Sequence, residues 1–265
     1  MDIFSITQPT GPKVPIIISS PHSGTFFPDD IKKRLRPNLA AAPDDTDWFI
    51  DRLYDFAPAM GITLIKANYS RWVIDLNRDP KSKPLYDDGR VITGLCTTTD
   101  FNGNPLYEYG EPDDAEIAQR VEKYYIPYHL KLAQLTQEMK QEFGKALLFD
   151  AHSIRKIVPG IRPEPFPELI LGDNDGTSAW PQVIETAWQA LQDKGYEAQH
   201  NHPFKGGYIT RFFGRPQNRV HALQLEMAKT NYMDATETQY DEANANRIRA
   251  VLQNLFAQLI KAIEE

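Results

Sequence analysis

Apolar residues along the chain follow two periods, one typical of buried strands and one typical of amphipathic helices. Short, almost uninterrupted runs of strand-forming residues predict strands that are buried on both faces. The runs at 14–19 and 146–149 are expected near the centre of a sheet. The complete set of strand-like runs comprises residues 14–19, 62–65, 72–74, 146–149, 169–171, 208–210 and 220–225.

Longer stretches carry apolar residues at helical spacing. They predict a helix that begins near Trp48 and helices over about 114–143, 178–194 and 240–263. Pro127 is expected to kink or split the second of these, because proline cannot donate a backbone hydrogen bond. Asp44, Asp45 and Asp47 precede the first helix, where carboxylates can accept the free amide hydrogens of the first turn.

Strands that alternate with helices predict a three-layer α/β sandwich around one parallel or mixed sheet. The chain has 265 residues, of which 41% are hydrophobic and 25% charged, so we expect a single domain over residues 1–265. Residues 77–109 interrupt the alternation with Pro, Gly, Asp and Thr. A connection of that length in a compact domain is often functional.

The net negative charge of the chain limits which classes of molecule it is expected to bind. The formal charge of −7 argues against a duplex nucleic acid, whose phosphates require a basic face. A small anionic substrate is compatible with this charge where arginines gather locally. We expect a cytoplasmic protein without a membrane partner, because neither a secretory signal nor an apolar stretch of roughly 20 residues is found. The lone Cys96 agrees with a reducing compartment and is expected to be a packed or loop thiol.

Two histidines follow strand-like runs, His22 in the segment 20–24 and His152 in the segment 150–153. The ends of neighbouring strands meet at one edge of a sheet, where α/β proteins usually build their sites. A hydrolytic zinc centre needs about three protein ligands and an open position for water. The two histidines and one of the nearby aspartates offer this set. Asp47 and Asp51 lie one helical turn apart, so one could bind the metal while the other orients a histidine.

Two further polar groups follow strand-like runs. Asp75, Asn77 and Arg78 come directly after the run at 72–74. Arginine binds carboxylates through two hydrogen bonds and can polarise a carbonyl oxygen, although a surface ion pair between Asp75 and Arg78 is the alternative. Glu226 comes at the end of the run at 220–225. Partial burial there would raise the pKa of its carboxyl group and suit it to take a proton from water, whereas a solvated glutamate is the simpler alternative.

Taken in order, these segments resemble the N-formylglutamate amidohydrolase family. The resemblance covers about residues 15–235 and implies a zinc-carboxypeptidase-like fold with a mixed central sheet. It also implies hydrolysis of N-formyl-L-glutamate to formate and L-glutamate, a step in one route of histidine degradation. The segments that carry it lie at 20–24, 47–54, 75–78, 150–153, 206–208 and 224–226.

The same resemblance implies roles for single residues. Zinc would lower the pKa of a bound water, a glutamate would remove its proton, and zinc and an arginine would stabilise the oxyanion. These roles fall on His22, Asp47 and His152 for zinc, on Glu226 for the base and on Arg78 for the arginine. In zinc carboxypeptidases the acidic ligand follows the first histidine by three residues, where this chain has Thr25. Asp47 therefore takes that place, with Asp45 as its rival.

Both carboxylates of such a substrate need cationic partners, and Arg211 is the first candidate. Gly207 would let backbone amides approach the ligand, or would form a tight turn. The other expected substrate contacts are Arg78, Asn77 and Arg71, with Arg155 and Arg215 behind them.

Two other functions stay open. A metal-dependent deacylase of another N-acylated acidic amino acid or short peptide would use the same residues. A noncatalytic binder of acidic ligands would keep the arginines only. The presence of His22, His152 and Glu226 argues for an enzyme, because a binder does not need to activate water.

Overall fold

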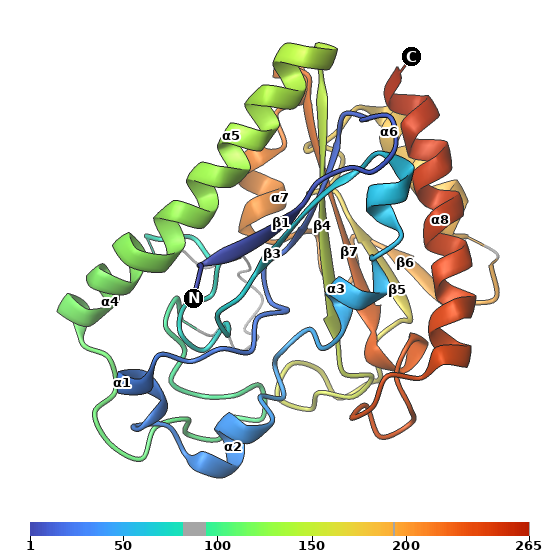
Figure 1. Ribbon diagram of the computed structural model, residues 1–265. Helices are drawn as coiled ribbons and strands as arrows, with labels where there is room; N and C mark the ends of the chain where they lie inside the picture. The colour runs from blue at the N-terminus through green and yellow to red at the C-terminus, as the bar shows by residue number, and fades with distance from the viewer. Residues whose placement is uncertain (82–93, 193, 265) are drawn as a thin grey trace.

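One mixed sheet of seven strands forms the centre of the molecule, in the order β1-β3-β2-β4-β7-β5-β6 (Figure 1). The computed structural model describes residues 1–81, 94–192 and 194–264. Strands β3, β2, β4 and β7 are parallel, whereas β1 runs antiparallel to β3 and β5 runs antiparallel to β7. The strands are β1 (Phe4–Thr7), β2 (Ile16–Ser20), β3 (Thr63–Ala67), β4 (Ala146–Ile154), β5 (Leu169–Gly172), β6 (Ala198–His200) and β7 (Val220–Ala228).

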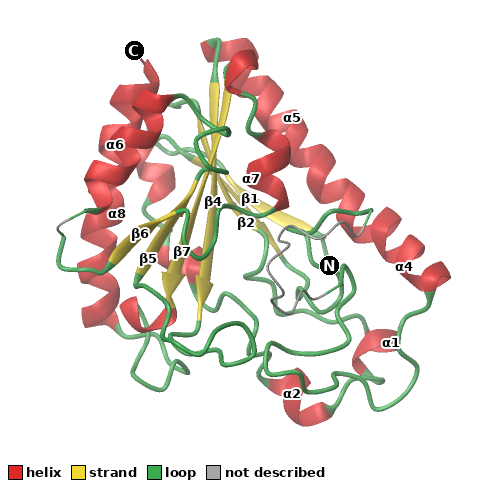
Figure 2. Cartoon of the chain, turned by 180° about the vertical axis from the view of Figure 1, so that it is seen from behind, coloured by secondary structure: helices red, strands yellow, loops and turns green. Residues whose placement is uncertain are grey.

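Helices cover both faces of this sheet, which confirms the predicted three-layer α/β fold (Figure 2). On one face, α6 (Pro181–Leu191) and α8 (Glu242–Glu264) pack on each other and on the sheet. On the other face, α5 (Ile126–Phe143) and α7 (Tyr208–Phe213) cover β4. The shorter helices are α1 (Asp29–Lys32), α2 (Pro37–Ala41), α3 (Ile50–Leu53) and α4 (Asp114–Arg120), with 3-10 turns η1 (Ala57–Met60), η3 (Pro216–Asn218) and η4 (Lys229–Asn231).

Alternation along the central strands decides which face carries the polar residues. Phe149 and Leu223 point into the core on the α8 side, whereas Leu148 and Ala222 point into the core on the α5 side. Successive side chains of a strand point to opposite faces. The even-numbered residues towards the ends of β4 and β7, which include His152 and Glu226, therefore share the α5 side of the sheet.

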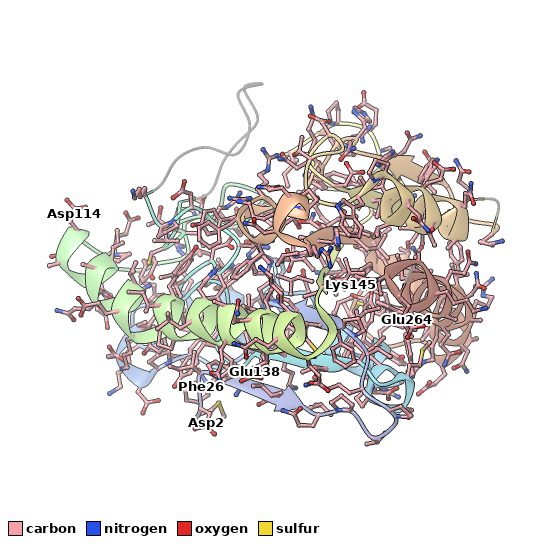
Figure 3. The ribbon with its side chains drawn as sticks, turned by 90° about the horizontal axis from the view of Figure 1, so that it is seen from above. Asp2, Phe26, Asp114, Glu138, Lys145 and Glu264 are labelled. Atoms are coloured by element: carbon pink, nitrogen blue, oxygen red, sulfur yellow. The ribbon has the colours of Figure 1, made fainter. Side chains whose placement is uncertain are left out.

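The long helix predicted over 114–143 is split, as expected. Helix α4 ends at Arg120, a π-helical turn η2 (Val121–Tyr125) follows, and α5 begins at Ile126 with Pro127 in its first turn. The π-helical turn lies just before Pro127, which cannot donate an α-helical hydrogen bond to the preceding turn. Seen from above, the segment crosses the molecule from Asp114 to Lys145 (Figure 3).

Three local predictions are wrong. Residues 208–210 belong to helix α7, and Trp72 and Val73 lie in a turn and not in a strand. A helix does begin near Trp48, although it is only the four-residue α3. His152 and Glu226 lie within β4 and β7, because these strands continue beyond their apolar cores. The short edge strands β1 and β6 were missed, since each has an exposed side and no apolar run. Of the segment 77–109, residues 82–93 lie outside the described residues.

Two smaller expectations can be compared directly with the fold. Cys96 is buried and carries no disulfide, in agreement with a packed thiol. Helices in the described part of the chain are all too short or too polar to span a bilayer.

Candidate active site

His22, Asp47 and His152 converge at the end of the sheet from three separate segments. Asp47 Oδ2 lies 3.1 Å from Nδ1 of His152 and 3.8 Å from Nδ1 of His22. The ligand atoms of the three residues all lie within 4.8 Å of one another, and the imidazole centroids are 4.8 Å apart. All three side chains are buried. Two nitrogens and one carboxylate oxygen are therefore close enough together to hold a metal ion.

The outer nitrogen of each imidazole is held by a second aspartate. Nε2 of His22 lies 2.8 Å from Oδ1 of Asp75, and Nε2 of His152 lies 2.9 Å from Oδ2 of Asp150. A carboxylate accepts an N–H bond, so each pair favours a proton on Nε2, and Nδ1 of each ring is the nitrogen on the side of Asp47. Carboxylates that orient metal-binding histidines in this way are a common feature of metal sites.

Strand pairing and one backbone bond bring the three segments together. Ser19 of β2 pairs with Asp150 of β4, so the chain beyond each strand end reaches the same level of the sheet. The amide of Asp47 donates to the carbonyl of His22 at 3.0 Å. Asp47 is therefore fixed next to the first histidine by main chain, although the two are 25 residues apart.

Asp45, the rival acidic ligand, has a different environment. Its carboxylate accepts from Nε1 of Trp72 at 3.0 Å and from the amide of Phe101 at 3.2 Å. Burial raises the pKa of Asp45 to about 6. Of the two rivals, the structure places Asp47 with the histidines and Asp45 in a neighbouring loop contact.

The expected N-capping by these aspartates is wrong. Helix α3 begins after Phe49, which has a left-handed backbone conformation, and its first turn receives no side-chain cap. The carboxylate of Asp44 instead pairs with Arg155 at 2.7 Å. Asp51, expected to share a function with Asp47, pairs with Lys66 at 2.5 Å and not with either histidine.

Charged neighbours set the pKa values of the cluster. Burial alone would lower the pKa of His152, but Asp150 and Asp47 outweigh this and hold it well above its usual value. Burial and the Arg71 guanidinium lower the pKa of His22, against the opposing effect of Asp75. Burial would raise the pKa of Asp75, yet Arg71 and His22 keep it well below its usual range. The buried carboxylates of Asp47, Asp75 and Asp150 therefore favour positive charge near His22 and His152.

Glu226 lies beside His152 on the neighbouring strand. The two residues are register partners in the parallel pair of β4 and β7, and both point to the α5 side. Glu226 is half-buried. Burial, reinforced by the nearby carboxylate of Asp47 and opposed by His152 and Arg71, raises its pKa to about 8. Such a carboxyl group is poised to exchange a proton near neutral pH.

Comparison with known proteins decides the family. The sequence profile of the family described as N-formylglutamate amidohydrolase matches residues 14–233. The chain belongs to the N-formylglutamate amidohydrolase family. It is 42% identical over 254 residues to an N-formylglutamate deformylase of Pseudomonas aeruginosa, with 92% of this chain and 94% of that protein covered. An N-formylglutamate deformylase of Pseudomonas putida is 39% identical over 251 residues, with 94% and 93% covered. The chain is therefore an amidohydrolase.

Solved structures agree with this assignment. The crystal structure of an N-formylglutamate amidohydrolase from Ralstonia eutropha JMP134 superposes with a TM-score of 0.81 at 28% identity, covering 100% of this chain and 98% of that one. A gene product of Agrobacterium tumefaciens gives a TM-score of 0.78 at 17% identity, with 100% and 97% covered, and shares the fold.

Within this family member, Arg71 and Asn77 use their polar atoms inside the protein. Arg71 donates to Asp75 Oδ2 at 2.6 Å and to the carbonyl of Asp45 at 3.3 Å. The Asn77 amide group donates to Asp150 Oδ2 at 2.8 Å, and its oxygen accepts from the amide of Ile209 at 2.7 Å. These contacts hold both side chains against the aspartates, and their contact with substrate stays a prediction.

Gly207 allows a close approach, but of a protein group. A Cβ built at this position would lie 2.4 Å from Nδ2 of Asn77, so only glycine leaves room for that amide. The amide of Gly207 donates to Gln224 Oε1 at 2.7 Å. The space that a Cβ would take at Gly207 is thus occupied by Asn77, and the contact of Gly207 with a ligand stays a prediction.

The two arginines predicted to contact substrate, Arg78 and Arg211, have different partners in the structure. Nε of Arg78 lies 3.4 Å from Asp75 Oδ2, with about a fifth of the Arg78 side chain exposed. The ion pair of Arg78 with Asp75, the alternative expected at the surface, is thus present. Asp75 is buried, however, and its other oxygen lies 2.8 Å from Nε2 of His22. Arg211 lies on α7, and its Nε donates to the carbonyl of Gly206 at 2.8 Å.

Asp150 was missed as a site residue, although a signal for it exists. It precedes His152 by two residues in β4, so both side chains point to the same face. Two side-chain contacts to the backbone of the segment 76–78 were not predicted either. Tyr125 donates to the carbonyl of Arg78 at 2.7 Å, and Nε2 of His129 lies 2.8 Å from the carbonyl of Leu76. No local pattern marks these two residues, because their targets are 47 and 53 positions away.

Proposed function

We propose that this amidohydrolase hydrolyses N-formyl-L-glutamate to formate and L-glutamate with one divalent cation, zinc, held by His22, Asp47 and His152. The names of the two Pseudomonas relatives support the substrate. The observation that carries the proposal is the convergence of Nδ1 of His22, Oδ2 of Asp47 and Nδ1 of His152.

The residues fit a divalent cation in both chemistry and charge. Imidazole nitrogen and carboxylate oxygen are usual zinc ligands, and three of them with an open fourth position are typical of catalytic zinc. Asp47, Asp75 and Asp150 are buried together, and isolated buried carboxylates are strongly unfavourable without compensating positive charge. When bound, such a cation supplies Lewis acidity, which lowers the pKa of a water molecule and polarises a carbonyl group.

Glu226 is the proposed general base and acid. It accepts the proton of the attacking water while the new carbon–oxygen bond forms at the formyl carbon. It then returns that proton to the amide nitrogen as the carbon–nitrogen bond breaks, so that formate and the free amino group leave. Its pKa of about 8, raised by burial, falls when positive charge is added nearby, which frees the carboxylate for the first step.

Arg78 is the proposed oxyanion and substrate contact. Its position beside Asp75 and its partial exposure support this role. A guanidinium next to the reacting carbonyl stabilises the negative charge that develops on oxygen. Arg211 remains the first candidate to bind a carboxylate of this small anionic substrate. We further propose that the reaction belongs to histidine degradation and takes place in the cytoplasm.

Two experiments test the function. Purified protein with one equivalent of zinc is assayed for formate release from N-formyl-L-glutamate, and matched N-acetyl- and N-succinyl-L-glutamate are assayed for release of acetate and succinate. We expect formate release to be the fastest. Equal or faster release of the larger acids would instead assign a deacylase of other N-acyl acidic amino acids. The second experiment replaces His152 with alanine, and we expect both bound zinc and formate release to be lost.

A further inference from the structure

Asp47 is carried by a segment without regular secondary structure, whereas His152 and Glu226 lie in strands. Strand residues are positioned by the sheet. Residues 43–47 lie outside the sheet, so contacts from other elements must place them in addition to the bond from the Asp47 amide to the His22 carbonyl. We propose that Lys229 is a positioning residue that holds this segment and thereby places the Asp47 carboxylate for the metal. The inference rests on the metal site proposed above.

Lys229 is a fully enclosed lysine, with 2% of its surface exposed. It follows β7 directly, in the turn η4. Its ammonium group donates to the backbone carbonyl of Asp44 at 2.7 Å. A buried ammonium ion is costly unless it makes strong polar contacts, so this residue requires a structural reason.

The surroundings of Lys229 point to Asp47. Burial lowers the pKa of Lys229, and the acidic group that most favours its charged form is Asp47, followed by Asp44 and Glu237. The ammonium group of Lys229 therefore interacts with the carboxylate of Asp47 and also bonds the backbone of the segment that carries Asp47. Both effects favour one arrangement of residues 43–47.

Arg155 binds the side-chain carboxylate of Asp44, whose backbone carbonyl accepts from Lys229. Its Nη1 donates to Asp44 Oδ2 at 2.7 Å, and its Nε donates to Glu237 Oε2 at 3.3 Å. Arg155 follows β4, which carries His152, and Lys229 follows β7, which carries Glu226. Asp44 is thus tied to the ends of the two strands that carry the other site residues, three positions before Asp47.

Lys229 has two effects on metal binding that act in opposite directions. As a positive charge, it repels a cation, so its removal alone would tighten metal binding. As a tether, it orders Asp47, so its removal would weaken metal binding. Loss of a residue that orients a metal ligand typically reduces affinity by about 10-fold to 100-fold. The sign of the change therefore distinguishes positioning from simple charge repulsion.

The test measures the zinc dissociation constant of metal-free protein by competition with a chromophoric chelator, without reference to activity. We expect Lys229→Met to bind zinc at least about 10-fold more weakly than the unmodified protein. Lys229→Arg, which can still donate to the Asp44 carbonyl, should recover most of the loss. Lys13→Met removes an exposed lysine paired with Glu142 and should leave zinc affinity unchanged.

Leu252→Ala separates positioning from general destabilisation. Leu252 is fully buried in the core between α8 and the sheet, so this variant should unfold more readily yet bind zinc with normal affinity. If Lys229→Met does not fold, Arg155→Met replaces it, because the Arg155 side chain is 37% exposed. This variant should weaken zinc binding by about 3-fold or more, a smaller loss than for a full ligand-orienting contact.

Each outcome decides the inference. Unchanged or tighter zinc binding by folded Lys229→Met, or by Arg155→Met in its place, overturns the positioning role while the metal site stands. A loss of zinc affinity in Leu252→Ala equal to that in Lys229→Met also overturns it. Absence of zinc binding by the unmodified protein would overturn the proposed metal site itself, and this inference with it.

Discussion

Oδ1 of Asp75 lies 2.8 Å from Nε2 of His22, on the nitrogen that faces away from Asp47. The other oxygen of Asp75 accepts from Arg71 at 2.6 Å. Asp75 therefore links a buried guanidinium to the histidine and fixes both the ring orientation and the position of its proton. Nε2 of His152 likewise lies 2.9 Å from Oδ2 of Asp150, so each histidine is oriented by its own aspartate.

Replacement of Asp75 by asparagine should weaken metal binding by about 10-fold to 100-fold, because the amide is a poorer acceptor for the His22 N–H bond. The same change leaves Arg71 without its carboxylate, so thermal stability should also fall. Zinc affinity is measured by chelator competition. Asp51→Asn is the matched control, since Asp51 pairs with Lys66 at the surface and should not affect zinc affinity. Equal zinc affinities for Asp75→Asn and the unmodified protein would contradict the orienting role.

Replacement of Glu226 by glutamine should reduce kcat by about 100-fold to 10,000-fold while zinc remains bound, because only the proton transfer is removed. In the unmodified protein the rate should rise with pH as the carboxyl group ionises. The midpoint should lie below about 8, since bound positive charge favours the carboxylate over the value set by burial alone. Steady-state rates across pH test this. A glutamine variant that keeps the acidic limb would assign that ionisation to another group.

Removal of the metal should lower thermal stability. A ligand that binds only the folded state stabilises it, by about 2.7 kcal/mol at a free concentration of one hundred times its Kd. Addition of zinc to metal-free protein should therefore raise Tm by several degrees. His152→Ala should abolish this shift, whereas Lys13→Met should retain it. A zinc-dependent shift that survives in His152→Ala would place the binding site elsewhere.

His129 should make the free energy of unfolding depend on pH in the acidic range. Burial lowers the pKa of His129 to about 4, with a partly opposing hydrogen bond to the Leu76 carbonyl. The unfolded imidazole titrates near its ordinary pKa of about 6.5, so between these values the unfolded state binds more protons. Stability from this residue is complete above that range and is lost as the pH falls towards 4, by at most about 3 kcal/mol.

Denaturant unfolding of His129→Gln against the unmodified protein measures this contribution. Glutamine can still donate a hydrogen bond but does not titrate in this range. The difference in free energy of unfolding between the two proteins should be constant above pH 7 and should shift in favour of the variant as the pH falls to 4. A difference that does not change with pH would show that His129 titrates normally.

Part of the fold could be predicted from local sequence because burial on two faces leaves a strong pattern. The runs at 14–19, 62–65, 146–149, 169–171 and 220–225 became β2, β3, β4, β5 and β7. Each of these strands lies inside the sheet, where almost every side chain is buried. The last helix, α8, follows the predicted spacing for the same reason, since one face packs on the sheet.

The failures occur where a distant contact overrides local preference. Residues 208–210 read as a strand, but the carbonyl and side chain of Asn77 accept from the amides of Tyr208 and Ile209 and hold the first turn of a helix. Residues 72–74 are strand-like in composition, but Arg120 donates to the carbonyl of Val73 at 2.9 Å and keeps this segment in a turn. Neither partner is near in sequence.

The sequence by itself determined the residue types of the candidate site and placed His22, His152 and Glu226 at or near the ends of buried strands, because burial on both faces leaves uninterrupted apolar runs in the local sequence. Only the tertiary structure decided that Asp47 joins His22 and His152, since Trp72 and the amide of Phe101 engage Asp45. It also decided that Asp75 and Asp150, and not Asp51, hold the histidines. The choices of Asp47 and Asp75 depend on contacts between segments far apart in the chain, which no local pattern of residues encodes. Asp150 differs, because it lies two residues before His152 in the same strand.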